Sequence, residues 1–278
     1  MYIVDGIAKP EIPADDRGLH YGDGLFETLA LVDGHPLHWD RHLARLARGA
    51  ARLGLPCPDV AQWRADLDLA LACAPPRPQR VLKLLLTRGS GGRGYAPPAA
   101  PRPRRIVHLS EWPAWPAERA DAGIRLMLCA TPLGRNRRLA GLKHLNRLEQ
   151  VLGAAEVAAA GADEGLMFDD RDELIEGTRT NVFVAQADIW LTPALDEAGI
   201  AGILRELVLE AAQEAGIAVR ETRIPRALLA TAEEIFVCNS LAGIWPVREL
   251  AGAPPRRFDA WPATTRVVET LRARGALA

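Results

Sequence analysis

The sequence predicts a mixed α/β fold divided into two domains. Its 278 residues are enough for two domains of ordinary size. Segments typical of strands are mixed with amphipathic helices in both halves, and the strict alternation of a doubly wound parallel sheet is absent. The stretch 112–116, Trp-Pro-Ala-Trp-Pro, is a stiff connection. We therefore expect a small N-terminal α/β domain over 1–112, a linker over 113–117 and a larger C-terminal domain over 118–278.

The pattern of the first domain predicts several strands and two helices. Asp5-Gly6 and Asp33-Gly34 are hairpin signals between apolar runs. Asp40 is expected to cap a helix whose apolar residues recur at spacings of three and four and which ends at Gly54. The predicted elements are a hairpin over 1–9, a loop over 16–24, strands over 25–32, 36–39, 80–88 and 106–109, and helices over 40–54 and 60–73.

The second domain shows the same mixture. Its clearest helix follows Ile200-Ala201-Gly202 and carries Leu204, Leu207 and Val208 on one face. The other predicted elements are helices over 145–160, 225–231 and 262–274, strands over 124–130, 166–169, 173–177, 181–185, 189–192, 219–223 and 234–238, and a loop over 239–243.

Composition and charge narrow the classes of function. The net charge is -1, so the chain lacks the basic footprint of a protein that binds nucleic acid or an anionic membrane. The four cysteines form no Cys-x-x-Cys pair. His38 and His42 are four residues apart, but Trp39-Asp40 between them indicates a helix start, and we predict no metal site. With no signal peptide and no membrane-spanning run, we expect a cytoplasmic protein.

A glycine-rich loop over 89–94 follows the strand predicted over 80–88 and matches the G-x-G-x-x-G spacing of dinucleotide-binding proteins. That motif must open a helix whose N-terminus meets the pyrophosphate. The residues that follow, Tyr-Ala-Pro-Pro over 95–98, cannot begin one. We therefore expect a loop that lines a site, where Arg88 and Arg93 would suit a carboxylate.

Lysine is scarce in this chain. Among 34 basic residues, only Lys9, Lys83 and Lys143 are lysines. Lysine can lose its proton near neutral pH when partly buried, and its amine can form a Schiff base, whereas arginine does neither. Lys143 also lies where a loop meets a predicted helix, a common place for chemistry. Lys143 is therefore the first catalytic candidate, with chance survival in an arginine-rich composition as the alternative.

Several common chemistries are excluded by their missing motifs. The chain has no Gly-Lys-Ser/Thr phosphate loop, no His-x-x-x-His pair with a Glu and no Gly-x-Ser-x-Gly elbow. A solitary lysine, anion-binding elements and isolated acids in strands suit pyridoxal phosphate, which needs a lysine, an acid for its ring nitrogen and a phosphate site. The turn over 202–204 offers helix N-terminal amides for a phosphate, although an ordinary helix start is the simpler interpretation.

Several segments together resemble the fold type IV pyridoxal-phosphate enzymes, which include branched-chain aminotransferases, D-amino acid transaminases and 4-amino-4-deoxychorismate lyases. These segments are 16–27, 42–46, Lys143, 176–183 and 201–203. Two further segments, 87–95 and 139–150, resemble the lyases specifically. The resemblance extends to about Val247, nearly the whole chain. It implies the two-domain fold of the group, with the cofactor in the cleft, and a homodimer.

The resemblance also implies roles for individual residues. Lys143 matches the lysine that carries the cofactor, and Glu176 matches the acid paired with the pyridine nitrogen. Arg45 matches the phosphate arginine. Leu204 stands where related transaminases often have Thr, so only its amide would serve. The remaining cofactor-binding candidates are Ile203, Ser240 and Asn239.

For the substrate, the weaker candidates are Arg88, Arg93, Tyr95 and Arg147, while Lys83 and Glu173 are interpreted as structural or rim residues. The resemblance implies a lyase that makes 4-aminobenzoate and pyruvate from 4-amino-4-deoxychorismate for folate synthesis. The alternative is a D-amino acid or branched-chain aminotransferase. His-Leu-Asn-Arg over 144–147 disfavours the branched-chain type, which carries a Tyr there. A non-catalytic relative is a third possibility, against which the set of Lys143, Glu176 and Arg45 argues.

Overall fold

The protein folds into two compact units in a computed structural model that describes residues 1–91, 93–116, 118–187, 189–252 and 255–278. The first unit comprises 1–113, 142–146 and 278, and the second comprises 114–141 and 147–277.

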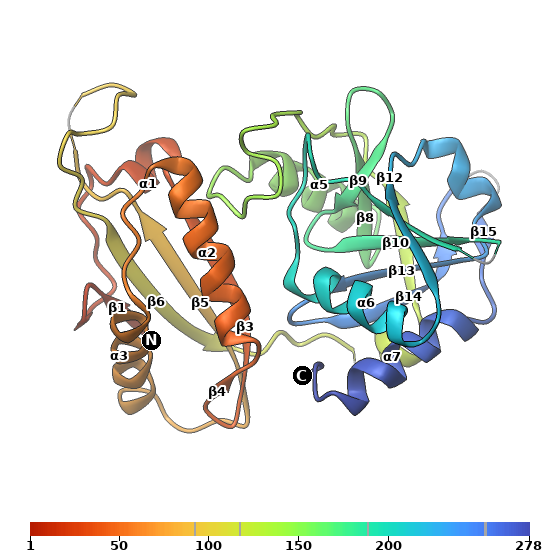
Figure 1. The fold of residues 1–278 in the computed structure, drawn as a ribbon, viewed down its shortest axis with the longest axis horizontal. Helices are drawn as coiled ribbons and strands as arrows, with labels where there is room; N and C mark the ends of the chain where they lie inside the picture. Colours follow the sequence, from red (N-terminus) through yellow and green to blue (C-terminus); the bar gives the residue numbers. More distant parts are fainter. Residues whose placement is uncertain (92, 117, 188, 253–254) are drawn as a thin grey trace. The chain divides into compact units, whose positions relative to one another are not determined.

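The first unit is built on a six-stranded antiparallel sheet in the order β2-β1-β6-β5-β3-β4 (Figure 1). Its strands are β1 (Tyr2–Val4), β2 (Ile7–Ala8), β3 (Gly24–Val32), β4 (His35–Pro36), β5 (Gln79–Thr87) and β6 (Arg104–Glu111). Its helices are α1 (Arg17–Tyr21), α2 (Trp39–Leu53) and α3 (Val60–Ala72).

The core of this unit lies between the sheet and helices α2 and α3. Leu25 and Leu29 of β3 lie opposite Leu86 and Leu82 of β5, and all four are buried. They share one cluster with apolar residues of α2 and α3, including Leu46. Because strand side chains alternate between faces, this face of β3 carries residues 25, 27, 29 and 31.

The predictions for the start of the chain need two corrections. The predicted loop over 16–24 contains the short helix α1, because Asp16 accepts a hydrogen bond from the amide of Gly18 and Gly22 ends the helix with a φ of 62°. Helix α2 begins at Trp39 and not after a cap at Asp40. His38 has a φ of 55°, which ends the extended chain early and shortens the predicted strand 36–39 to two residues, His35–Pro36.

The second unit is built on a mixed nine-stranded sheet in the order β12-β11-β10-β13-β14-β7-β8-β9, with β15 paired to β14. Its strands are β7 (Ile124–Leu128), β8 (Glu164–Phe168), β9 (Leu174–Gly177), β10 (Asn181–Gln186), β11 (Ile189–Pro193), β12 (Ala218–Thr222), β13 (Glu234–Asn239), β14 (Gly243–Leu250) and β15 (Arg256–Arg257). Its helices are α4 (Glu118–Ala122), α5 (Leu148–Ala159), α6 (Ile203–Glu214) and α7 (Pro262–Ala273), with a 3₁₀ turn at Arg226–Thr231.

Strand β14 was not predicted, although it lies in the middle of this sheet. Pro246 and the charged pair Arg248 and Glu249 hide its apolar pattern. The strand forms because it pairs antiparallel with β13 and parallel with β7, so its register is set by neighbours distant in sequence.

The segment 142–146 belongs to the first unit and not, as predicted, to the domain that follows the linker. The Phe26 amide donates to the Lys143 carbonyl at 2.9 Å, and the Leu145 amide donates to the Gly24 carbonyl at 3.0 Å. These bonds hold the segment extended along β3. Helix α5 consequently begins at Leu148 and not at the predicted residue 145.

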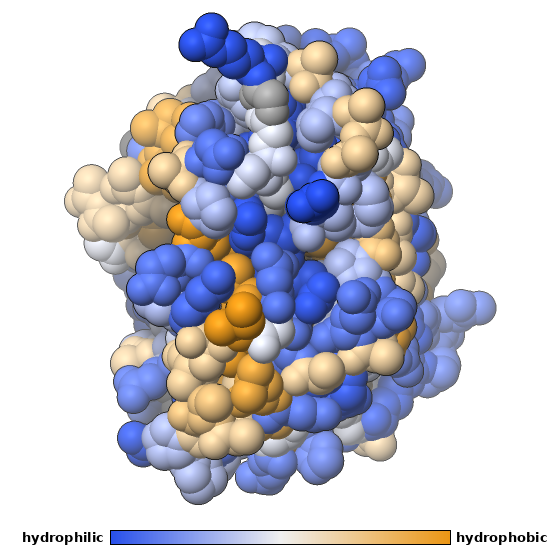
Figure 2. All heavy atoms as spheres, turned by 90° about the vertical axis from the view of Figure 1, so that its left-hand side faces the viewer, coloured by the Kyte–Doolittle hydropathy of each residue, from blue (hydrophilic) through white to orange (hydrophobic). Residues whose placement is uncertain are grey.

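The surface of the first unit is chemically mixed. Figure 2 shows hydrophilic residues interspersed with smaller hydrophobic groups over this side of the molecule. Among the residues that the structure describes, no helix is both long and apolar enough to span a membrane.

Candidate functional site

In the first unit, Lys143 lies against strand β3. Its side chain is partly buried, and its amine lies 4.2 Å from the centre of the Phe26 ring. Close approach of the two segments depends on Gly24, where a Cβ would come 2.3 Å from the Leu86 carbonyl oxygen and 2.8 Å from Leu145. A glycine at this position therefore lets the segment that carries Lys143 lie directly on the strand.

A buried acid holds the predicted phosphate arginine. Glu27 of β3 accepts from Arg45 Nε at 2.8 Å and from Arg45 Nη2 at 2.5 Å, a bidentate pair. The same carboxylate lies 2.6 Å from His42 Nδ1, so a proton on that nitrogen donates to it. Although burial opposes ionisation, Arg45 and His42 lower the pKa of Glu27 to about 2. Arg45 is thereby held rigidly on α2.

Sequence reasoning missed Glu27 and His42 as functional candidates. The available signal was the alternation of β3, in which Glu27 occupies an inward position between Leu25 and Leu29. An acid on the apolar face of a strand requires a buried partner. Burial lowers the pKa of His42, and the positive charges of Arg45 and Lys143 lower it further, against the opposing effect of Glu27.

Arg88, a predicted substrate ligand, is bonded on all sides within the first unit. It is buried, and its Nε donates to Asp23 at 2.8 Å. Its two terminal nitrogens donate to the carbonyls of Leu53 and Gly54 at 3.0 and 2.9 Å, at the C-terminal end of α2. These contacts favour support of α2 over binding of a substrate.

The other two loop candidates, Arg93 and Tyr95, are exposed, and Tyr95 retains 85% of its accessible surface. Arg17 holds this loop by donating to the carbonyls of Gly94 and Tyr95 at 3.1 and 2.8 Å. Gly92 of the glycine-rich motif lies outside the described residues, and no helix follows the motif over 93–103. The roles of Arg93 and Tyr95 stay predictions.

In the second unit, Glu176 is a buried, firmly held carboxylate on β9. One oxygen accepts from Gln150 Nε2 at 3.2 Å, and the other accepts from the Ile200 amide at 2.8 Å. Burial lowers the pKa of Arg147, while the charges of Glu176 and Glu149 raise it, so Arg147 lies within electrostatic reach of Glu176. Gln150 is a second residue that the sequence analysis did not single out.

The N-terminus of α6 is the predicted phosphate site. Gly202 is its N-cap and has no side chain that could cap the amides of the first turn, which includes Ile203 and Leu204. A Cβ at Gly202 would come 2.0 Å from Asn181 Oδ1, so only glycine fits this position as it stands. A helix of twelve residues that begins without a side-chain cap is suited to an anion.

Asn239 shapes the turn that carries Ser240. Its Oδ1 accepts from the amides of Leu241 and Ala242 at 2.9 and 2.7 Å, and its Nδ2 donates to the Arg179 carbonyl at 3.2 Å. Both polar atoms of the Asn239 side-chain amide are thus bonded to backbone groups, which favours a structural role. A direct contact of Ser240 or Asn239 with a cofactor stays a prediction.

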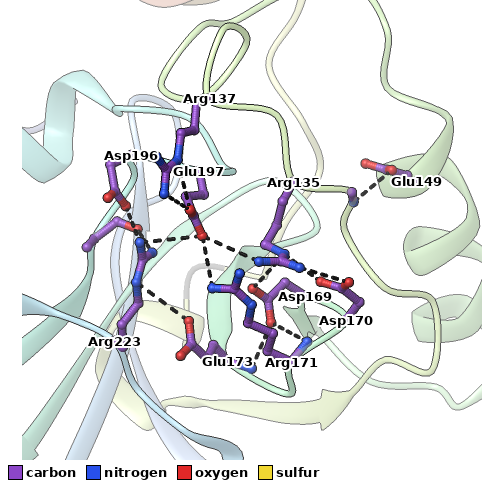
Figure 3. A network of polar contacts seen from close by, with 12 residues as sticks. Arg135, Arg137, Glu149, Asp169, Asp170, Arg171, Glu173, Asp196, Glu197 and Arg223 are labelled. Carbon is purple, nitrogen blue, oxygen red and sulfur yellow. Dashed lines mark hydrogen bonds and ion pairs between the residues drawn. The ribbon is translucent and has the colours of Figure 1, made fainter.

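An ion-pair network fixes the loop that leads to Lys143 (Figure 3). At its centre, Glu197 accepts from Arg137 at 2.6 and 2.9 Å and from Arg171 at 3.3 Å. Arg135 and Arg223 lie 3.6 Å from the same carboxylate. Backbone bonds add to this network, because the Gly141 amide donates to the Gly199 carbonyl at 2.8 Å. The network therefore ties the loop before Lys143 to the loop that presents the Ile200 amide to Glu176.

Comparison with known proteins identifies the family. Residues 24–250 match the model of the family described as amino-transferase class IV. This chain belongs to the class IV aminotransferase family. It is 34% identical to a protein of Vibrio harveyi named aminodeoxychorismate lyase, over 93% of this chain and 94% of the relative. It is 30% identical to a protein of Methanocaldococcus jannaschii named putative branched-chain-amino-acid aminotransferase, over 85% and 82%.

A solved structure of this family agrees in detail with the fold. The crystal structure of 4-amino-4-deoxychorismate lyase from Pseudomonas aeruginosa matches with a TM-score of 0.92 and 42% identity, covering all of both chains. The predicted mixed α/β fold, the predicted membership of an enzyme family and pyridoxal phosphate as its cofactor are confirmed by these comparisons.

The residues of each unit fit this cofactor. The first unit presents two basic side chains: Lys143, next to the aromatic ring of Phe26, and the buried Arg45 on α2. The second presents helix N-terminal amides without a side-chain cap and the buried carboxylate of Glu176. A lysine, phosphate-binding groups and an acid for the ring nitrogen are the parts that pyridoxal phosphate requires.

Proposed function

We propose that this protein is a pyridoxal-phosphate-dependent lyase that converts 4-amino-4-deoxychorismate to 4-aminobenzoate and pyruvate. The observation that carries the proposal is the order of similarity within the family. Identity is 42% and 34% to two proteins named as this lyase, against 30% to a protein named as an aminotransferase. The segment over 139–150, which resembles the lyases, surrounds Lys143.

Several groups of this chain would make up the cofactor-binding set. Lys143 would bind the cofactor covalently and Arg45 would bind its phosphate, with Glu27 fixing the guanidinium. The amides of Ile203 and Leu204 at the start of α6 would also bind phosphate. Ser240 and Asn239 are the remaining predicted contacts.

Two residues of the chain would act on protons during the reaction. When bound, pyridoxal phosphate supplies an electron-withdrawing ring that takes up the electrons left by proton loss. The Lys143 amine would accept the proton from the ring carbon that bears the substrate nitrogen. Glu176 would hold the proton on the pyridine nitrogen, and Gln150 and the Ile200 amide keep its carboxylate in place. The carbon–oxygen bond to the enolpyruvyl group then breaks, and formation of the aromatic ring drives the step. The oxygen leaves with the bonding electrons as enolpyruvate, which takes up a proton at its terminal carbon to become pyruvate.

We also infer a homodimer in the cytoplasm. The apolar side chains of Leu148, Val151 and Leu152 on α5 retain 78%, 60% and 56% of their accessible surface. Three neighbouring exposed apolar residues on one helix suit contact with a second copy. All four cysteines are free thiols, which suits a reducing compartment.

The alternative function is a D-amino acid or branched-chain aminotransferase, favoured by the similarity to the Methanocaldococcus jannaschii protein. The two reactions differ in their need for an acceptor, because a transaminase must pass its amine to a keto acid.

Pyruvate release from 4-amino-4-deoxychorismate, with no keto acid present, tests the proposal. We expect continuous release by the wild type and none above background by Lys143→Ala. Arginine cannot replace this lysine as a base, so Lys143→Arg is the matched control that keeps the charge and should also be inactive. Full activity of Lys143→Ala would disprove the assignment of Lys143. Amine transfer from an amino acid to a keto acid, without pyruvate release, would favour the alternative.

A further inference from the structure

A cavity of the first unit lies away from Lys143. Its volume is about 640 Å³, within the usual range for sites that bind small molecules. Leu31 of β3 lines it, whereas Lys143 contacts Phe26, which lies about 17 Å away along the same strand. Because strand side chains alternate between faces, Leu31 and Phe26 also point to opposite faces of the sheet. The cavity is therefore separate from the surroundings of Lys143.

The lining of this cavity is largely apolar and partly rigid. Several of its residues belong to the proline-rich segment that follows α3, and a proline has a fixed φ and no amide hydrogen to donate. The apolar lining residues are Leu31, Leu71, Ala74, Pro75, Pro76 and Pro78. Such walls suit the flat apolar face of an aromatic ring.

Arg80 of β5 lines the cavity and is a buried cation without a carboxylate partner. It retains 8% of its accessible surface. Among the residues that the structure describes, no carboxylate lies within ion-pair distance of its guanidinium, although Glu111 lies opposite it in the sheet. Its recorded hydrogen bond is donated by Nη2 to the Pro75 carbonyl. Buried charges are normally paired, so an unpaired buried guanidinium at a cavity favours an anionic ligand.

The other charged residues of the cavity limit the charge of that ligand. Arg77 and Asp33 also line it, and both are exposed. Two arginines and one aspartate leave the cavity with one net positive charge. Asp33 would repel a second negative charge on the ligand, so a monoanion is favoured over a dianion.

We propose that this cavity binds a small aromatic monocarboxylate. The carboxylate accepts hydrogen bonds from the guanidinium of Arg80, whose planar donors match its geometry. The ring packs against Leu31, Leu71 and the proline-rich segment. The inference goes beyond the proposed function, because it concerns neither the proposed substrate nor the surroundings of Lys143.

Hydrogen–deuterium exchange of the cofactor-loaded protein in the presence of benzoate tests this inference. Benzoate should slow exchange in peptides that cover 31–34 and 71–80, whereas the neutral benzamide and the dianion phthalate should protect them less at equal concentration. In Arg80→Met, which removes the charge, the same protection should require at least about tenfold more benzoate. Arg48→Met is the matched control, since Arg48 is an exposed arginine of α2 outside the cavity, and it should behave like the wild type.

A second variant keeps the test decisive if Arg80→Met does not fold. Arg80→Lys retains the positive charge but loses the planar pair of donors, so it should bind benzoate more weakly than the wild type. Absence of protection at 31–34 and 71–80 would overturn the inference, as would equal protection by benzamide or phthalate, or wild-type affinity in both variants. Failure of the proposed function is a separate result, namely no pyruvate release by the wild type, because binding of benzoate requires no turnover.

Discussion

At the scale of residues, the buried set of Glu27, His42 and Arg45 explains how a flexible arginine, the predicted phosphate ligand, is held in one position. Glu27 retains 1% of its accessible surface and Arg45 retains 7%. Burying two charges is costly unless the geometry is good, and the bidentate pair provides that geometry. Burial of these charged groups therefore lowers the folding stability that the first unit could otherwise reach, and in return one guanidinium is held in place.

Glu27→Gln should lower the free energy of unfolding by about 3–5 kcal/mol, because it leaves the buried charge of Arg45 uncompensated. Chemical denaturation measures this change. Glu111→Gln, at the exposed end of β6, is the control and should change stability by less than about 0.5 kcal/mol. Equal stability of the two variants would contradict the account of the buried set.

Glu27 should also make the stability depend on pH. Its folded pKa is about 2, below the ordinary value of 4.5. The unfolded state therefore binds a proton first as the pH falls, and stabilisation of roughly 3 kcal/mol is lost between pH 4.5 and 2. The lowered pKa of His42 adds a loss of the same sign that begins below its ordinary value of 6.5. Unfolding curves at successive pH values should show a shallower acid loss for Glu27→Gln than for the wild type.

These residues differ in how clearly the sequence alone identifies them as candidates. Lys143 stands out as a candidate because lysine is scarce and the surrounding motif is distinctive. Glu27 gave only a weak signal, since its partners lie 15 and 18 residues later on a helix whose face toward β3 is set by packing. The sequence alone also does not reveal that Lys83 lies near Phe26, because this proximity follows from the pairing of β3 and β5.

At the scale of elements, the ion-pair network around Glu197 holds two loops that carry no regular structure. One loop leads to Lys143, and the other presents the Ile200 amide to Glu176. Arg137 is mostly exposed, yet its guanidinium donates twice to Glu197, and this hydrogen bonding lowers the pKa of the carboxyl. One carboxylate among four arginines thus orders both loops.

Glu197→Gln should loosen the loop over 132–141 and speed trypsin cleavage after Arg135, Arg137 or Arg138 several-fold, because local opening exposes these bonds. Timed digestion followed by mass spectrometry measures the rates. Glu214→Gln removes an exposed ion pair with Arg274 elsewhere in the unit and should leave cleavage of the loop unchanged. If both variants were cut at the wild-type rate, the network would have no role in ordering the loop.

Elements with strong local patterns were predicted well, and elements set by tertiary pairing were not. Helix α6 has a clear apolar face and begins at the predicted residue, Ile203. Strand β14 was missed because Pro246 and its charges mask a central strand that two neighbours stabilise. Helix α5 begins three residues late, since the first residues of its pattern are bonded to β3.

At the scale of the whole molecule, the two-unit fold and the family could both be inferred from the sequence, since the motifs extend along nearly the whole chain. The exact division could not, because residues 142–146 fold with the first unit although they lie between segments of the second. The assignment of residues 142–146 to the first unit depends on backbone hydrogen bonds between segments far apart in the sequence. Hydrophobic periodicity carries no information on such bonds.

The proposed homodimer makes a prediction about α5. Val151→Glu should raise the dimer dissociation constant at least about tenfold, because it places a charge within the exposed apolar face of this helix. Sedimentation velocity over a range of concentrations measures it. Val60→Glu on α3 is the matched control, since Val60 is 56% exposed and Val151 is 60% exposed. A monomeric wild type, or equal dissociation of both variants, would contradict a dimer through α5.

The most direct test of the central claim is the number of turnovers in the absence of any keto acid. Purified protein saturated with pyridoxal phosphate is mixed with a large excess of 4-amino-4-deoxychorismate, and 4-aminobenzoate and pyruvate are both quantified. A lyase should form the two products in equal amounts, far in excess of the enzyme, with no formation by Lys143→Ala. Product formation that stops at one equivalent of enzyme, or that requires a keto acid, would contradict the account.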